Sequence, residues 1–344
     1  MPSLSVLDLI PVRSDQATGD ALRASTALAQ TADALGFRRY WVAEHHNTTS
    51  VASTNPPVLI AMLASATQQI SVGSGGVMLP NHSPLVVAEQ FALLEAAFPG
   101  RIDLGIGRAP GTDPLTRYVL RGQEMEDADA AVNKFPQYVS EIGMLMRPEG
   151  VEIAYGQRHQ SLRATPLARS VARMWLLGSS EYSAQLAAQQ GLPYVFAHHF
   201  FGQGTEQALK IYRDTYQPSE LYPEPTTFLT VNASVAESAE EAFRLAIPHM
   251  QSMIALRTGG PFTAQRTVEE AEEIGFPDAH LPLVEAMREK WIVDEPASAK
   301  RRIAEFAAEH GVDEVMVQPI GGALAGTPVD RSPAREATLR LLAE

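Results

Sequence analysis

Short continuous apolar segments alternate along the chain with segments of helical periodicity. The apolar segments predict strands over 4–12, 38–46, 70–79, 101–108, 174–178, 192–197, 227–235 and 313–319. The periodic segments predict helices over 19–36, 56–68, 83–98, 180–190, 204–217, 237–257 and 332–343. Because the connections are short, the strands should run parallel with right-handed crossovers. Eight such units predict one α/β domain over 1–344, a (β/α)8 or TIM barrel rather than an open doubly wound sheet.

Two segments are too long for ordinary loops and are predicted as insertions in the barrel. The first, about 109–173, follows the fourth strand and should hold a helix (about 124–146) and a small hairpin around 151–156. The second, about 258–296, follows the seventh strand and should hold two short helices and no strand. Long excursions of this kind usually form lids or binding loops.

The helix predicted at 83–98 carries the clearest local signals. Ser83 can cap it, and Pro84 suits its first position. One face is apolar, with Val87, Phe91, Leu94 and Phe98. This face would either cover the barrel or form a seam between two copies of the chain.

Composition excludes several classes of function. The absence of cysteine rules out disulfides, thiolate catalysis, zinc fingers and iron–sulfur clusters. The net charge of −13 argues against a nucleic acid or an anionic membrane as the main partner. The N-terminus resembles a strand rather than a signal peptide, and no apolar run is long enough to span a membrane. We therefore expect a cytoplasmic protein.

In a TIM barrel the active site lies where the strands end, so catalytic and binding residues are expected at the ends of the predicted strands. They carry Asp8, Glu44, His45, His46, Gly75, Gly76, Met78, Arg108, Gly178, Ser179, Ser180, His198 and His199. Glu44 and Asp8 could form the carboxylate pair of a glycosidase, but nothing in the sequence fixes their separation.

His45 and His46 follow a strand directly, and adjacent side chains on a strand point to opposite faces. At most one of them can therefore face the barrel mouth, and the spacing does not match a metal-binding pair. A histidine at the mouth suits proton transfer, whereas a structural histidine would bond a backbone carbonyl. Gly75 and Gly76 lie inside a buried strand. They indicate either the close approach of a flat ligand or a narrowing of the barrel interior that small residues fill.

Arg108 and the segment GSSEYS (178–183) suggest an anion site. A guanidinium at a strand end can bind a phosphate, although Arg108 could instead pair with Asp113. Ser179, Ser180 and Ser183 would bring hydroxyls and backbone N–H groups to a helix N-terminus, where a serine can equally serve as the cap.

Three long strings carry a resemblance to a known family. They are WVAEHHN (41–47), VGSGGVMLPNHSPLVVAEQFALLEAAFPGRIDLGIGRAPG (72–111) and WLLGSSEYSAQLAAQQGLPYVFAHHF (175–200). They resemble the bacterial luciferase-like flavin monooxygenases, in particular a single-component branch with GSGGVMLPNH and GRAPGTD strings. The resemblance extends from Leu4 to about Val235, with a weaker match at 296–318.

The resemblance implies a TIM barrel that binds reduced FMN at the C-terminal rim. It assigns the active-site histidine to His45 and a non-proline cis peptide bond under the flavin to Gly75–Gly76, with Met78 nearby. It assigns phosphate binding to Arg108 and to the loop of Gly178, Ser179, Ser180 and Ser183. Ser179 stands where luciferase has a glutamate and Gly107 where it has a reactive cysteine, which makes light emission from a long-chain aldehyde doubtful.

The sequence thus predicts an FMN-dependent monooxygenase that uses O2 on a small organic substrate. No GxGxxG motif follows a strand, so a separate flavin reductase should supply reduced FMN. Weaker pocket candidates are Asp8, His46, His82, His198 and His199. The family resemblance also implies a homodimer formed through early helices. The alternatives are a deazaflavin-dependent dehydrogenase of the same barrel superfamily and a non-catalytic flavin-binding protein.

Overall fold

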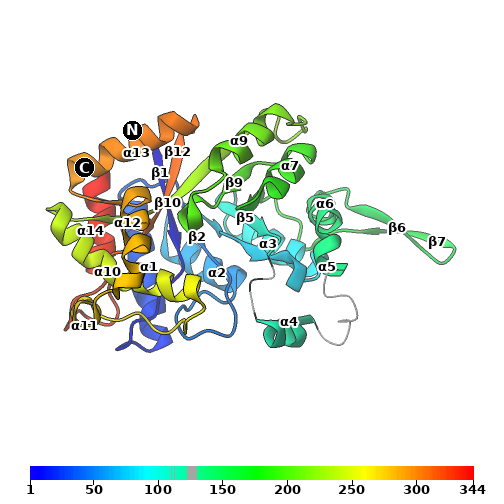
Figure 1. The fold of residues 1–344 in the computed structure, drawn as a ribbon. Coiled ribbons are helices and arrows are strands. Elements are labelled where there is room, and N and C mark those ends of the chain that lie inside the picture. The colour runs from blue at the N-terminus through cyan, green and yellow to red at the C-terminus, as the bar shows by residue number, and fades with distance from the viewer. Residues whose placement is uncertain (110, 112, 122–129) are drawn as a thin grey trace.

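The computed structural model describes residues 1–109, 111, 113–121 and 130–344, which form a closed parallel barrel surrounded by helices (Figure 1). The barrel strands are β1 (Ser3–Asp8), β2 (Arg39–Val42), β3 (Ser71–Ser74), β5 (Ile102–Gly107), β8 (Arg173–Gly178), β9 (Tyr194–Phe196), β10 (Thr227–Val235) and β12 (Glu314–Pro319). They neighbour one another in chain order. The ring closes because β10 pairs with β9 and with β12, and β12 pairs with β1. The predicted TIM barrel is confirmed.

Helices cover the outside of this barrel. They are α1 (Thr18–Ala34), α2 (Pro56–Ala66), α3 (Pro84–Ala97), α7 (Glu181–Gln189), α9 (Thr205–Asp214), α10 (Ala239–Thr258), α13 (Pro296–His310) and α14 (Pro333–Ala343). Helix α13 was not among the predicted elements. Its signals were local: Glu295 accepts hydrogen bonds from the first-turn N–H groups, and Gly311 ends the helix in the left-handed conformation.

The predicted strand at 70–79 is divided in two. β3 ends at Ser74, and β4 (Val77–Met78) begins after Gly75 and Gly76, whose peptide bond is cis. A Cβ on Gly76 would lie 2.8 Å from the carbonyl oxygen of Gly105 on the neighbouring strand. Close backbone packing inside the barrel therefore requires a residue without a side chain at Gly76. This agrees with the alternative that small residues fill a narrow part of the barrel interior.

The middle of the barrel is filled by aromatic rings. Trp41, Trp175 and Phe228 contact one another edge-on, with ring centroids 5.0–5.7 Å apart. These rings come from β2, β8 and β10, so they close the barrel interior below its C-terminal end. A ligand at this fold must consequently lie above them, at the rim.

The first insertion holds α4 (Pro114–Arg121), α5 (Ala130–Asn133), α6 (Phe135–Leu145) and an antiparallel hairpin of β6 (Val151–Tyr155) and β7 (Arg158–Leu162). The hairpin, predicted around 151–156, projects away from the barrel (Figure 1). The helix predicted at about 124–146 falls partly outside the described residues, and α5 and α6 occupy its described part.

The second insertion holds α11 (Val268–Ile274), a 3-10 turn (Asp278–His280), α12 (Leu281–Lys290) and β11 (Ile292–Asp294). The two short helices were predicted, but the expectation of no strand was wrong. β11 extends the edge of β10 through Ala233–Val235. Three residues are too few to show a strand periodicity in the sequence.

The apolar face predicted on α3 packs inward. Val87 and Phe91 are fully buried and Leu94 nearly so, so this face covers the barrel. A homodimer seam on α3 would instead have to use the outer side, where Val86 and Leu93 are exposed. Ser83 precedes the helix, but its side chain makes no capping bond among the described residues. Within the described ranges, no helix has the length and hydropathy of a membrane span.

Candidate active site

Alternation along β1 turns Asp8 away from the barrel mouth. Leu7 packs with the aromatic rings inside the barrel, whereas Asp8 points outward, where Arg335 of α14 donates to it at 2.6 Å. Ser25 and Tyr40 also donate to this carboxylate. Burial would raise the pKa of Asp8, but Arg335 and these hydrogen bonds hold it below its usual value. Asp8 is thus a buried structural carboxylate, and placing it among the pocket residues, or pairing it with Glu44 at the mouth, does not fit this geometry.

His45 and Glu44 diverge in the same way after β2. The backbone N–H of His45 donates to the carbonyl of Ser53, which fixes the chain at this point. The Nδ1 atom of His45 is buried and has no hydrogen-bond partner among the described residues. Burial lowers the pKa of His45, with Glu44 opposing the shift and His46 adding to it. The ring is therefore neutral at neutral pH and carries an unused nitrogen.

The carboxylate of Glu44 contacts several groups on the opposite side of the strand end from His45. His46 and His82 each contact its Oε1 atom at 2.7 Å, and the backbone N–H of Met78 donates to Oε2 at 2.9 Å. Burial would raise the pKa of Glu44, but the contacts with His82, His46 and Met78 lower it. His46 and His82 therefore belong to a cluster that fixes the strand ends. No group of three or more potential metal ligands occurs among the residues described.

Three neighbouring strands bring the predicted phosphate-binding residues to one level. Met78 is aligned with Gly107 on β5, and Gly107 is aligned with Leu177 on β8. The residues that follow, Arg108 and Gly178, are therefore adjacent at the rim.

The Arg108 guanidinium lies over the ring of Tyr182, 4.0 Å from its centroid. Tyr182 is in the first turn of α7, so the side chain of Arg108 and the N-terminus of α7 lie together. Tyr182 was not predicted as a site residue, because its contact with Arg108 depends on how two βα loops meet.

The serines before α7 have different roles. Ser179 and Ser180 are exposed, and within the described chain the Ser180 side chain makes no capping bond to the helix. Ser183 is buried, and its hydroxyl donates to the Ser180 carbonyl at 2.8 Å. A Cβ on Gly178 would lie 2.1 Å from this hydroxyl, so Gly178 lets the loop close tightly. The loop leaves exposed hydroxyls and first-turn N–H groups beside Arg108, which suits a phosphate.

His199 is in the short helix α8 (His198–Phe201), which follows β9 at the C-terminal end of the barrel. Its Nδ1 atom is 2.6 Å from the hydroxyl of Thr230. Burial lowers the pKa of His199 to about 3, with smaller contributions from His198, His249 and His45.

Asn232 is a rim residue that the sequence analysis missed. Its amide donates to the carbonyl of His199 at 3.0 Å, while its Oδ1 atom is buried without a partner in the described part of the chain. The available signal was an amide inside the otherwise apolar strand 227–235.

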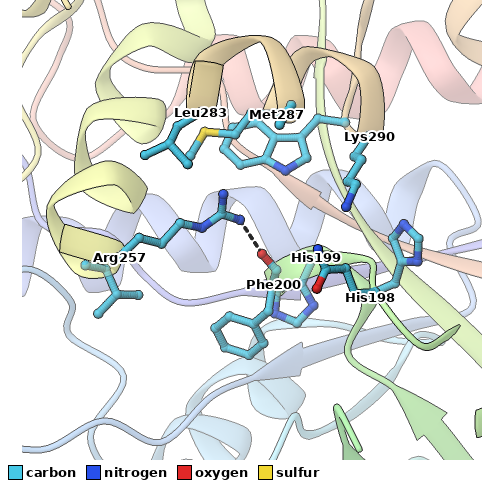
Figure 2. Close-up of a pocket in the computed structure, with 11 residues that line it drawn as sticks. His198, His199, Phe200, Arg257, Leu283, Met287 and Lys290 are labelled. Carbon is cyan, nitrogen blue, oxygen red and sulfur yellow. Dashed lines mark hydrogen bonds between the residues drawn. The ribbon is translucent and has the colours of Figure 1, made fainter. Parts of the chain in front are cut away.

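A cavity of about 470 Å³ opens beside His199, between α8, α10 and α12 (Figure 2). Its lining residues are His198, His199, Phe200, Gln203, Leu256, Arg257, Leu283, Ala286, Met287, Lys290 and Trp291. The second insertion thus supplies one wall of the cavity, and the two predicted histidines supply another. Neither His46 nor His82 lines it.

Similarity to known proteins extends over most of the chain. The family model described as luciferase-like monooxygenase matches residues 3–314. Protein YvbT of Bacillus subtilis is 41% identical over 314 residues, covering 91% of this chain and 90% of that protein. A luciferase-like monooxygenase of Escherichia coli is 38% identical over 315 residues, covering 92% and 90%.

Solved structures show the same fold. The apo-MsnO8 crystal structure aligns with a TM-score of 0.86 at 31% identity, covering 100% of this chain and 98% of that one. The oxygenating component of 3,6-diketocamphane monooxygenase from Pseudomonas putida, in complex with FMN, aligns at 0.72 and 16% identity, covering 100% and 97%. An F420-dependent secondary alcohol dehydrogenase aligns at 0.64 and 13%, covering 99% of each chain.

Proposed function

The chain belongs to the luciferase-like monooxygenase family, and on that basis we propose that it is an FMN-dependent monooxygenase acting with O2 on a small organic substrate. One observation carries the proposal. Arg108 stacks on Tyr182 at the N-terminus of α7, on the same rim as the buried Nδ1 atom of His45, which has no hydrogen-bond partner among the described residues. A cation beside a helix N-terminus suits the phosphate of FMN, and a neutral imidazole suits a proton transfer.

The residues at the rim would suit both the phosphate and the ring of a flavin. Arg108, Ser179, Ser180 and the first turn of α7 would bind the phosphate, with Ser183 and Gly178 shaping the loop. Gly75, Gly76 and Met78 would lie under the flavin ring as backbone. Glu44 supports this assignment because its carboxylate holds the backbone N–H of Met78.

Bound reduced FMN would supply the electrons that activate O2, and the protein would supply position and shielding. His45 would accept or return a proton at Nδ1, because burial keeps the ring neutral near pH 7. Its backbone bond to Ser53 fixes the main chain from which the imidazole projects. The helices α10 and α12 beside the mouth would exclude water from the reaction.

Two partners belong to the proposal. A separate flavin reductase would deliver reduced FMN, because the chain has no dinucleotide-binding motif of its own. A second copy of the chain would cover the exposed apolar side chains of α2 and α3, namely Val58, Met62, Val86 and Leu93.

Cofactor binding tests the proposal against a deazaflavin enzyme. The purified apoprotein is titrated separately with FMN and with coenzyme F420, and the absorption change of each cofactor is followed. We expect saturable binding of FMN and far weaker binding of F420. Tight binding of F420 without binding of FMN would contradict the proposal and favour hydride transfer without oxygen.

Turnover separates an enzyme from a flavin-binding protein. NADH oxidation is followed with a flavin reductase, O2 and a panel of aldehydes, ketones and alkanes. We expect one class of compound to give an oxygenated product and to raise NADH oxidation above the uncoupled rate. No product from any compound, despite bound FMN, would favour a binding or storage role.

A further inference from the structure

His199 lines the cavity between α8, α10 and α12, and its two ring nitrogens have different surroundings (Figure 2). We propose that the Nε2 atom of His199 accepts a hydrogen bond from the substrate, and that the substrate is a neutral organic molecule with a hydroxyl group and an apolar body. Thr230 is then the positioning residue that sets the tautomer of the ring. This inference rests on the proposed function, because it names a substrate class for the same reaction. The hydroxyl group serves recognition and is not identified with the group that is oxidised.

Two residues of β10 hold His199 in place. The Nδ1 atom of His199 is 2.6 Å from the hydroxyl of Thr230, and the amide of Asn232 donates to the His199 carbonyl at 3.0 Å. Thr230 and Asn232 are two residues apart on one strand, so they are on the same face of it. Phe228, two residues before Thr230, packs with the rings inside the barrel, which makes this the inner face. The barrel thus fixes both the backbone and the Nδ1 edge of His199.

The contacts of the Thr230 hydroxyl indicate which ring nitrogen carries the hydrogen. The backbone N–H of His199 donates to this hydroxyl at 3.5 Å, and the hydroxyl donates to the carbonyl of Phe196 at 3.4 Å. A hydroxyl group has one hydrogen and two lone pairs. When the hydrogen is used by the Phe196 carbonyl, Nδ1 of His199 must donate to the second lone pair. All three contacts are then satisfied, and Nε2 carries the lone pair of the ring.

The Nε2 atom is left for a ligand. It makes no hydrogen bond to any described residue, and it is not among the fully buried atoms that lack a partner there. Because the ring lines the cavity, Nε2 is accessible from it. Burial lowers the pKa of His199 to about 3, so the ring is neutral near pH 7 and Nε2 keeps its lone pair. An acceptor in such a wall needs a donor from the ligand.

The donor that fits this cavity is a neutral one. No lining residue of the described cavity is acidic, so an ammonium group would have no counter-charge beside Nε2. A hydroxyl group donates a hydrogen bond without bringing a charge. Arg257 also lines the cavity, where it donates to the carbonyl of Phe200. The proposed contact uses His199 alone and needs no charge of the lining.

The remaining wall suits an apolar body. It includes Leu256, Leu283, Ala286, Met287 and Trp291. The cavity volume of about 470 Å³ is within the usual range for a small-molecule pocket. Contact of several carbons with this wall would supply most of the affinity, and the bond to Nε2 would supply the selectivity.

The test uses flavin-free protein and two probes with the same carbon skeleton, 4-phenylbutan-2-ol and 4-phenylbutan-2-one. The alcohol donates and accepts a hydrogen bond, whereas the ketone only accepts. Binding is followed by tryptophan fluorescence, because Trp291 lines the cavity while Trp41 and Trp175 are buried inside the barrel. The variant Trp291→Phe should lose most of the signal, which assigns it to this site. We expect the wild type to bind the alcohol at least about fivefold more tightly than the ketone.

Two substitutions of His199 separate its two nitrogens. In His199→Asn the amide can still bond Thr230, but no atom remains at the place of Nε2. The preference for the alcohol should therefore disappear while the ketone affinity changes little. In His199→Gln the longer amide reaches the place of Nε2 and should restore part of the preference. His310→Asn is the matched control, because Nδ1 of His310 donates to the Phe306 carbonyl at 3.0 Å and neither residue lines the cavity. It should change neither affinity.

Thr230 is tested by its hydroxyl group. Thr230→Val removes the hydroxyl at nearly constant volume, so Nδ1 of His199 loses its partner and the tautomer is no longer fixed. The preference for the alcohol should fall severalfold. Thr230→Ser keeps the hydroxyl and should restore the preference, which a purely packing role of the threonine would not predict. If His199→Asn does not fold, the Thr230 variants and His199→Gln decide.

Several results would overturn the inference. Equal affinity for the two probes, or tighter binding of the ketone, would show that Nε2 does not accept a hydrogen bond from the ligand. A preference that persists unchanged in His199→Asn would assign the selection to another residue. Wild-type preference in Thr230→Val would remove Thr230 as the positioning residue. No binding of either probe at millimolar concentration would show that the cavity does not take such molecules. FMN titration of the same protein is scored separately, so a failure of the proposed function can be told from a failure of this inference.

Discussion

The two ends of the barrel differ in how the buried polar groups that face its interior are paired. At the N-terminal end, Arg39 donates to Asp103 at 2.7 Å and to Glu314 at 2.6 Å. The indole N–H groups of Trp41 and Trp175 also donate to Asp103. At the C-terminal end, the buried Nδ1 atom of His45 and Oδ1 atom of Asn232 have no partner within the described residues.

This difference separates stability from function. A buried charge is tolerated only when it is paired and hydrogen-bonded. The network of Arg39, Asp103 and Glu314 at the N-terminal end, which we call the lower network, meets that condition. A buried polar atom without a hydrogen-bond partner lowers the free energy of unfolding. A protein retains such an atom where a ligand forms the missing hydrogen bond. The N-terminal, lower end therefore supports the barrel, and the C-terminal, upper end is the proposed binding site.

The largest expected effect is on turnover at the upper end. His45→Ala should lower the rate of substrate oxygenation about 10²–10⁴-fold, because general acid–base groups contribute by that factor. Flavin affinity and melting temperature should change little, since the Nδ1 atom has no hydrogen-bond partner to lose in the described part of the chain. Turnover, FMN affinity and melting temperature are measured together.

The matched control is His46→Ala, a substitution at the neighbouring residue. His46 contacts Glu44 rather than facing the mouth, so its loss should lower stability more than turnover. If His45→Ala retained full turnover while His46→Ala lost it at normal stability, the catalytic assignment would have to move to His46. Loss of stability alone in both variants would make both histidines structural.

At the lower end, Arg39→Met should cost about 3–5 kcal/mol of unfolding free energy, because Asp103 and Glu314 would remain buried without their cation. Chemical denaturation of the purified variant measures this loss. Arg38→Met is the control: Arg38 also contacts Glu314, at 3.2 Å, but is half exposed. It should cost less than about 1 kcal/mol. Equal stability of the two variants would contradict the supporting role of the lower network.

A smaller, pH-dependent effect should come from the histidines near the mouth. Burial lowers the pKa of His198 and of His249 to about 4 and that of His199 to about 3, below the value of about 6.5 in an unfolded chain. The unfolded chain thus binds protons first as the pH falls. Stability should be complete above about pH 6.5 and decrease towards pH 4, by about 1.4 kcal/mol per unit of pKa difference.

The check is the unfolding free energy at several pH values for the wild type and for His198→Asn. The variant should lose part of the decrease between about pH 6.5 and 4. His159→Asn, on the exposed strand β7, should leave the decrease unchanged. An identical pH profile in all three proteins would mean that burial of the mouth histidines does not affect stability.

Much of the fold was predictable because its signals are local. The eight strands and most of the helices follow from the spacing of apolar residues and from Pro and Gly at helix ends. Helix α13 carried local signals of this kind and was still not predicted. The two other differences lacked such a signal. β11 is three residues long, and the segment 70–79 is divided only by two glycines in a strand that otherwise looks continuous.

The candidate site was harder to predict, because it depends on which side of each strand faces inward. Alternation shows that Asp8 and Leu7 point to opposite sides, but not which one points into the barrel. The contacts of Arg108 with Tyr182 and of His82 with Glu44 join segments far apart in the chain. Their residue types were visible in the sequence, whereas their pairing follows only from the closed barrel.

The measurement that tests the upper end most directly compares FMN with riboflavin, which lacks the phosphate. Dissociation constants are determined for both flavins with the wild type and with Arg108→Ala. We expect the wild type to prefer FMN, and the variant to lose about ten- to a hundredfold in FMN affinity with riboflavin affinity almost unchanged. If FMN and riboflavin lost affinity equally, or if neither did, Arg108 and the N-terminus of α7 would not form the phosphate site.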